Sequence, residues 1–183
     1  HTIAITGIMH KFAIAPQSSA SLVRIKNWGN TKWRSMSMMF SNTIALEGIA
    51  PDAGVPDLSQ AESLHCMFIR SDIFNADLSK WDVSNIKDFS GVFYRTRDFN
   101  ADLSSWDTSS ASRMSGMFEG AHSFNQDISM WDVSKVDNMD RMFKDASSFV
   151  GKDLSCWITP NVSSHNHFFD GSGGGNTEPE WGS

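Results

Sequence analysis

The sequence is poor in cysteine, has no excess of positive charge and contains no long apolar run. Its 183 residues include 2 cysteines, and 15 lysines and arginines stand against 21 aspartates and glutamates, which gives a formal net charge of −6. Nucleic-acid phosphates require a basic surface, so we expect no nucleic-acid partner. No stretch approaches the ~18 consecutive apolar residues of a membrane-spanning helix, so we expect no insertion into a membrane.

The two cysteines, Cys66 and Cys156, stand several turns apart in the repeat described below. Successive turns of a repeat protein stack at roughly 5 Å, the spacing of paired strands, which would separate these residues by about 15 Å or more. A disulfide requires Cα atoms within roughly 7 Å of each other. We therefore predict two free thiols, both mostly buried.

The sequence does contain a repeat, which runs through its second half with a constant period. Nearly identical blocks begin at Phe74, Phe99 and Phe124, and a degenerate block, one residue longer, begins at Phe149. A fixed period of this length is typical of a solenoid, in which each unit buries its apolar face only against its neighbours. Such a chain presents a long repetitive surface, which favours binding over catalysis.

Each repeat contains the pattern of a short strand. Leu78, Trp81 and Val83 have the spacing of a leucine-rich-repeat strand. Side chains alternate along a strand, so Trp81 and Val83 point inward and their neighbours point outward. This predicts an inward column of stacked tryptophans, formed by Trp81, Trp106, Trp131 and Trp157.

The strand is followed by a pattern that predicts a helix of about three turns. Apolar residues at offsets of 3, 6 and 7 trace one helix face: Ile86, Phe89, Val92 and Phe93. Serines stand where an N-cap belongs: Ser84, Ser109 and Ser134. Asparagines in the next turn are expected to satisfy backbone groups of adjacent coils: Asn75, Asn100 and Asn125.

The last phenylalanine of each unit gives a count of six turns: Phe40, Phe68, Phe93, Phe118, Phe143 and Phe169. We therefore predict an α/β fold, a right-handed leucine-rich-repeat-like solenoid of about six turns over residues 21–170. Residues 1–20 form an N-terminal β cap in this interpretation, with a strand at 2–7 and an antiparallel return at 11–16. Residues 171–183 are a Gly-rich tail typical of a flexible linker, which Trp181 would anchor.

Three blocks carry a resemblance to a known family: FNADLSKWDVSNIKDFSGVF, FNADLSSWDTSSASRMSGMF and FNQDISMWDVSKVDNMDRMF. They resemble the repeats of the BspA-like leucine-rich-repeat proteins of bacterial surfaces, a unit also found in mycoplasma surface lipoproteins. The resemblance covers roughly residues 54–170 and is highly specific for the fold. It implies an exported, surface-displayed protein that acts in adhesion or in host and cell recognition, without a shared catalytic residue.

The outward strand face carries a ladder of like charges: Asp57, Asp82, Asp107 and Asp132. Neighbouring carboxylates about 5 Å apart repel by roughly 0.8 kcal/mol in water, so something should compensate. Two explanations remain open. The carboxylates bind Ca²⁺ or a cationic partner, or they accept hydrogen bonds from nearby serine hydroxyls and backbone N–H groups. A second column favours turn chemistry more strongly: Asp77, Asp102, Asp127 and Asp153.

The position before each tryptophan varies between units: Lys80, Ser105, Met130 and Cys156. Variation within a strict repeat indicates freedom from core packing, and leucine-rich-repeat proteins usually place ligand contacts there, although solvated filler explains it as well. We predict that the ligand contacts this face: Lys80, Asp82, Ser105, Asp107, Met130 and Asp132.

Two further places compete for ligand contacts. Tyr94 stands with Arg95 and Arg97, one turn after Arg70, which is typical either of a contact to an acidic glycan or of a solvated loop paired with Asp72 and Asp98. Trp181 offers an aromatic contact at the C-terminal end. His165, His167 and Asp170 resemble metal ligands only superficially, since His165 falls in a core column, so we expect no metal there.

No catalytic motif accounts for a function, since the sequence has no G-x-S-x-G, no H-E-x-x-H and no phosphate loop. We predict a non-enzymatic recognition module, extracellular or at the cell surface, that binds a glycan or a protein through the outward strand face. The alternative is an architectural tip or spacer of a longer fibre, monomeric or homotrimeric like phage-tail adhesins. The chain begins at His1 and shows no signal peptide, so we expect a piece of a longer protein.

Overall fold

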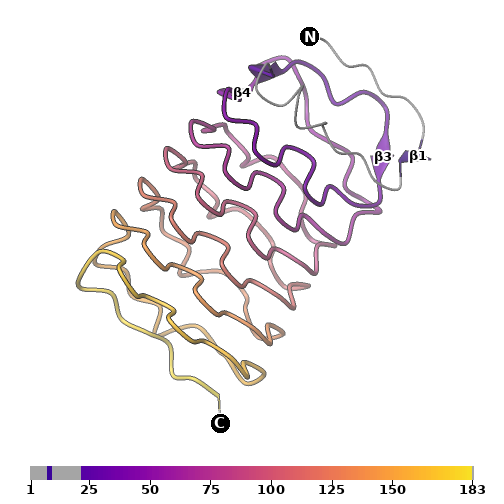
Figure 1. Cartoon of the computed structure of the whole chain (residues 1–183). Coiled ribbons are helices and arrows are strands. Elements are labelled where there is room, and N and C mark those ends of the chain that lie inside the picture. The colour runs from indigo at the N-terminus through magenta and orange to yellow at the C-terminus, as the bar shows by residue number, and fades with distance from the viewer. Residues whose placement is uncertain (1–7, 10–21, 183) are drawn as a thin grey trace.

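The computed structural model describes residues 8–9 and 22–182, and its chain winds back on itself repeatedly so that successive windings lie side by side (Figure 1). Within these residues, regular structure is limited to short strands: β1 (Ile8–Met9), β2 (Arg24–Ile25), β3 (Lys32–Trp33) and β4 (Gly48–Ile49). Strand β1 pairs in parallel with β3, and β2 pairs in parallel with β4. The strands predicted at 2–7 and 11–16 lie outside the described residues.

Parallel backbone pairing joins each winding to equivalent residues of the next one. Single bridges connect Ser63 to Asp88, Asp88 to Arg113 and Arg113 to Asn138. Between two windings, the N–H groups of residues 64, 66, 68 and 70 donate to the carbonyls of residues 88, 90, 92 and 94 at 2.8 to 3.0 Å. We call residues 64–70, and the equivalent residues 89–95, 114–120, 139–145 and 165–171, the ladder segments. The sequence period is therefore the period of this ladder.

The predicted helices are wrong, because no helix occurs within residues 8–9 and 22–182. Every second N–H of a ladder segment bonds to the next winding, so only the intervening groups bond locally. The N–H of Met67 donates to Leu64, and that of Ser71 donates to Phe68, which closes consecutive β-turns. Cys66 and Arg70, the third residues of these turns, have φ of 53° and 55°, which an α-helix does not allow. It follows that none of the described residues forms a helix that is long and apolar enough to cross a membrane.

The apolar positions that suggested a helix instead form a core of stacked rings. One column of phenylalanines has successive ring centroids 5.6 to 5.9 Å apart: Phe40, Phe68, Phe93, Phe118 and Phe143. A second column has spacings of 5.8 to 6.2 Å: Phe74, Phe99, Phe124 and Phe149. The columns also contact each other, with Phe93 and Phe99 stacked at 3.8 Å. The apolar residues are therefore spaced as on a helix face because one side of every winding is buried in the core.

The repeat tryptophans point inward, as predicted, with exposed fractions of 3 to 5%. The strand predicted around Trp81 is wrong, because residues 78–83 are irregular and the parallel pairing of this winding lies at its ladder segment instead. The rings of Trp106 and Trp131 stack at 6.3 Å with an interplanar angle of 8°. The indole N–H of Trp106 donates to the carbonyl of Leu78 in the preceding winding at 3.0 Å. Trp131 and Trp157 make the same bond to the winding before their own, at the carbonyls of Leu103 and Ile128. Each of these three buried indoles therefore satisfies its donor by joining two windings.

The asparagine column behaves as predicted. The side-chain carbonyl of Asn75 accepts the backbone N–H of Asn100 at 3.1 Å, and Asn100 in turn accepts that of Asn125 at 2.9 Å. Asn125 accepts the N–H of Val150 at 3.3 Å. These bonds satisfy backbone donors at the turn where no ladder bond is available, so the asparagines tie successive windings together.

The glycine-rich tail packs against the last winding and is not a flexible linker. Trp181 pairs in parallel with Thr159, and its ring stacks on His165 at 4.1 Å. It also meets Phe168 edge-on at 4.9 Å, so the predicted anchoring role is confirmed. A Cβ at Gly173 would collide with side-chain and backbone atoms of the preceding winding. Glycine serves close approach here, a use that composition alone does not distinguish from flexibility.

Replacing Trp106 by alanine should lower the free energy of unfolding by roughly 3 to 5 kcal/mol, because a large buried ring is lost and a cavity remains. The exposed Lys80→Ala change, which stays within about 0.5 kcal/mol of the parent, is the control. Guanidinium denaturation followed by far-ultraviolet circular dichroism measures both. A Trp106→Ala midpoint equal to that of the parent would contradict the inward position of this ring.

Candidate functional site

The predicted ligand contacts lie at the surface in two columns beside the buried tryptophans. All six are exposed: Lys80, Asp82, Ser105, Asp107, Met130 and Asp132. Met130 is 85% exposed, and Ile158, which takes the aspartate position in the last repeat, is 71% exposed. Cys156 shares the column of Met130 and is exposed, so its predicted burial is wrong, whereas Cys66 is partly buried; both thiols are free. We call these two columns the outward strip.

The aspartates of the outward strip form local turns with serine. Asp82, Asp107 and Asp132 each accept the backbone N–H of the serine two residues later, at 3.1, 3.0 and 2.9 Å. The second aspartate column makes the same bonds to its own serines at 2.9 to 3.0 Å. This geometry matches the hydrogen-bond explanation of the charge ladder. The serines therefore close aspartate turns and do not cap helices.

The serine bonds hold the carboxylates of Asp107 and Asp132 in their charged form. The pKa of Asp107 lies below its ordinary value because the side chain and then the backbone of Ser109 donate hydrogen bonds to it, while the charge of Asp132 opposes this shift more weakly. Serine contacts of the same kind lower the pKa of six further aspartates: Asp57, Asp77, Asp102, Asp127, Asp132 and Asp153. At Asp107, local hydrogen bonding thus outweighs the repulsion by Asp132.

Within the described part of the chain, no group of three or more His, Cys, Asp or Glu side chains is placed to hold a metal ion. His167 and Asp170 lie close, with 2.6 Å between Nδ1 and Oδ2. His165 is instead engaged with Trp181 by ring stacking at 4.1 Å. Trp181 is itself partly buried and donates its indole N–H to Glu178, so its contacts serve the packing of the tail.

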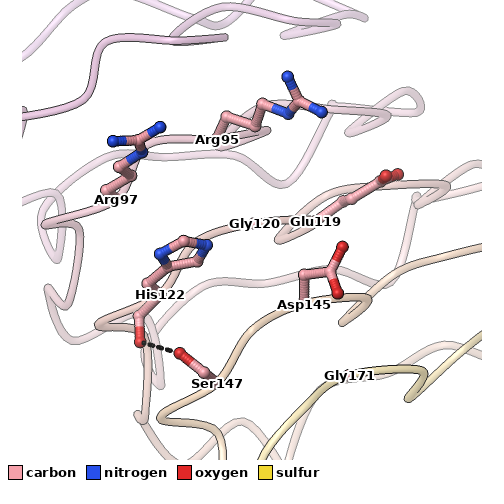
Figure 2. A pocket seen from close by; sticks show the side chains of 8 residues that line it. All are labelled: Arg95, Arg97, Glu119, Gly120, His122, Asp145, Ser147 and Gly171. Carbon is pink, nitrogen blue, oxygen red and sulfur yellow. Dashed lines mark hydrogen bonds between the residues drawn. The ribbon is translucent and has the colours of Figure 1, made fainter.

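Two shallow grooves lie on the ladder segments and not on the outward strip. The first, of about 640 Å³, crosses several windings and is lined by Tyr94, Gly91, Gly116 and Glu119 among others. The second, of about 510 Å³, is drawn in Figure 2 and also contains Glu119. We call the second one the charged groove. Its charged and polar lining comes from three successive windings: Arg95 and Arg97, then Glu119 and His122, then Asp145 and Ser147.

The charges of this groove are only partly neutralised by one another. Arg97 Nε lies 3.8 Å from Asp72 Oδ2, as the solvated-loop interpretation predicts, and Lys144 Nζ lies 3.9 Å from Glu119 Oε1. The Arg95 guanidinium lies over the ring of Tyr94, with its Cζ 5.3 Å from the ring centroid. Among the residues that the structure describes, no carboxylate forms an ion pair with Arg95.

The sequence pattern indicates Tyr94, Arg95 and Arg97 as a cluster but does not indicate the other side of the groove. The missed residues stand one and two repeat periods further on, where Gly120 and Asp145 share the column of Arg95. His122 and Ser147 share the column of Arg97 in the same way. These four residues can be found from the sequence by counting one and two repeat periods forward from each arginine. The repeat period therefore predicts which side chains meet at the surface as well as in the core.

The serine bonds make stability depend on pH. Because the folded pKa of Asp107 and Asp132 lies below the ordinary value of 3.8, their bonds stabilise the fold above that pH, and the stabilisation is lost as the pH falls below it. The variant Ser109→Ala/Ser134→Ala should therefore have a lower urea midpoint than the parent at about pH 7, with a smaller difference at about pH 2.5. The control is Ser148→Ala. An equal difference at both pH values would contradict the assignment.

A protein-family model matches the chain twice, over residues 6–104 and 62–181. Its description is "Mycoplasma protein of unknown function, DUF285". The two overlapping matches span residues 6–181, which is what an internal repeat produces. No curated protein and no solved structure shows a significant match.

Proposed function

The chain belongs to the DUF285 family, and we propose that it is a non-enzymatic recognition module, displayed at the cell surface or outside the cell. We further propose that its windings form a right-handed, leucine-rich-repeat-like solenoid of about six turns. The parallel bridges at intervals of one repeat period and the two phenylalanine columns support this architecture. The resemblance to BspA-like surface repeats supports the location and the role in adhesion.

The observation that carries the proposal is that one column of the outward strip varies while the neighbouring tryptophan column does not. The tryptophan position is the same in four repeats, while the exposed position before it holds Lys80, Ser105, Met130 and Cys156. Large apolar side chains are usually buried, yet Met130 and Ile158 are 85% and 71% exposed on this strip. A strip that combines charged side chains with the exposed apolar groups of Met130 and Ile158 suits a protein or glycan partner.

An architectural role is the second candidate, because one edge of the last winding is open. The tail covers this winding through the pairs Asp153–Thr177 and Thr159–Trp181. Within residues 22–182, no later segment pairs with the ladder segment 165–171. An unpaired edge invites pairing with another chain, which supports end-to-end contact in a fibre. Light scattering distinguishes the two roles, since the recognition module stays monomeric and the architectural element self-associates.

Binding through the outward strip is tested by replacing two of its residues with serine, which the same column already holds at Ser105. The variant Lys80→Ser/Met130→Ser should bind at least tenfold less tightly to a glycan or cell-surface protein that the parent captures on an array, since a few central residues carry most of the binding free energy. Its free energy of unfolding should stay within about 0.5 kcal/mol of the parent.

The matched control is Lys26→Ser/Ile44→Ser, which removes an exposed lysine and an exposed apolar side chain elsewhere. It should bind as the parent does. Equal loss in both double variants, or unchanged binding in the strip variant, would remove the outward strip as the contact surface.

A further inference from the structure

We propose that the charged groove binds an acidic saccharide, a sugar chain that carries carboxylate or sulfate groups (Figure 2). The outward strip and the charged groove use different segments of each repeat, so this second site does not depend on the first. The groove combines two features: a cation, Arg95, with which no carboxylate of the described residues forms an ion pair, and carboxylates on the next two windings.

The anion-binding element is Arg95, supported by Arg97 and His122. Arg97 has one long ion pair, of 3.8 Å, and its side chain is 62% exposed. Arg95 is exposed and is held over Tyr94 by a cation–π contact, with 5.3 Å between Cζ and the ring centroid. This contact positions the guanidinium while leaving its N–H groups available for a carboxylate or sulfate.

The carboxylates of Glu119 and Asp145 lie on the next two windings and restrict what the groove accepts (Figure 2). They accept hydrogen bonds and repel anions, so a compact and highly charged ion such as inorganic phosphate suits the groove poorly. A suitable ligand must offer a negative group to the arginines and O–H donors to the exposed carboxylate of Asp145, since the side chain of Glu119 is 12% exposed and lies beside Lys144. Acidic sugars combine these two properties within one residue or between neighbouring residues of a chain.

The backbone turn at Arg95 presents the side chain at the surface. Arg95 has φ of 56°, in the left-handed region that glycine adopts without strain. The same column holds glycine at Gly120 and Gly171, with φ of 70° and 69°, and other residues at Arg70 and Asp145, with φ of 55° and 58°. The left-handed position is therefore a feature of the turn in every winding, and at Arg95 it carries an exposed cation. A Cβ at Gly120 would lie 3.1 Å from Arg95 Cγ, so the glycine leaves room for the arginine.

The test is isothermal titration of the full chain with three defined tetrasaccharides. Tetragalacturonate carries carboxylates, a chondroitin sulfate tetrasaccharide carries sulfates as well, and maltotetraose is neutral. We expect one or both acidic probes to bind and the neutral probe not to bind. The comparison between the acidic probes identifies which anion the arginines prefer. Binding of neither acidic probe, or equal binding of maltotetraose, would overturn the proposal.

The variants separate a binding role from a structural one. Arg95→Gly should lower affinity for the acidic probe at least tenfold, the typical loss for one charge-assisted hydrogen bond, while leaving the melting temperature unchanged or higher because the strain is relieved. Tyr94→Ala should also weaken binding, since the guanidinium loses its support, whereas Tyr94→Phe keeps the ring and should bind within about twofold of the parent.

Lys135→Gln is the charge-matched control, since Lys135 is exposed, lies near Asp107 and does not line the groove. Equal weakening by Lys135→Gln and Arg95→Gly would reveal general charge attraction and overturn the site. Lys80→Ser/Met130→Ser should bind the acidic probes as the parent does. A result that overturns binding at the charged groove therefore does not affect the proposal for the outward strip, and the reverse also holds.

Discussion

Backbone hydrogen bonds between successive windings are the constraint on which the rest of the structure depends. The N–H of Cys66 donates to Ser90, that of Gly91 to Ser115 and that of Gly116 to Asp140, each in the following winding, at 2.8 to 2.9 Å. A buried backbone group without a partner costs roughly 1 to 3 kcal/mol, so a winding that changed its length would break several such bonds at once. The fixed length of the winding in turn places equivalent side chains above one another, which is why the phenylalanines stack in columns.

The same register organises the surface. Charged side chains one repeat period apart meet across windings, as Lys87 Nζ and Glu62 Oε1 do at 2.8 Å, and Arg113 and Asp88 at 3.2 Å. Exposed ion pairs of this kind stabilise a fold by at most about 1 kcal/mol, so most of the stability must come from the core and from the ladder. Surface positions can then change with little loss of stability. In the outward strip and the charged groove, the side chains that can change in this way are also exposed and have few internal contacts.

The sequence predicted the features that follow from periodic burial and missed those that depend on the local backbone. The repeat period, the inward Trp106 and the contact between Asn75 and the next winding could all be inferred from equal spacing. The helices could not, because consecutive β-turns with left-handed residues bury side chains at offsets similar to those of a helix. The packing of the tail was inferred only at Trp181, because glycine at Gly173 permits close packing as well as flexibility. The charged groove was half found, since reasoning along the chain recovers Arg95 but not the residues one and two periods away.

The most direct test of the register is to remove one repeat with two cuts that differ by a single residue. Deleting residues 100–124 joins Phe99 to Asn125 and keeps every column aligned. Deleting residues 100–123 joins Phe99 to Phe124 and shifts all later residues by one position, which turns inward side chains outward. Guanidinium unfolding measures both. The account predicts a cooperative transition for the first deletion, with a denaturant dependence reduced in proportion to the surface lost, and no cooperative transition for the second. Equal behaviour of the two deletions would contradict it.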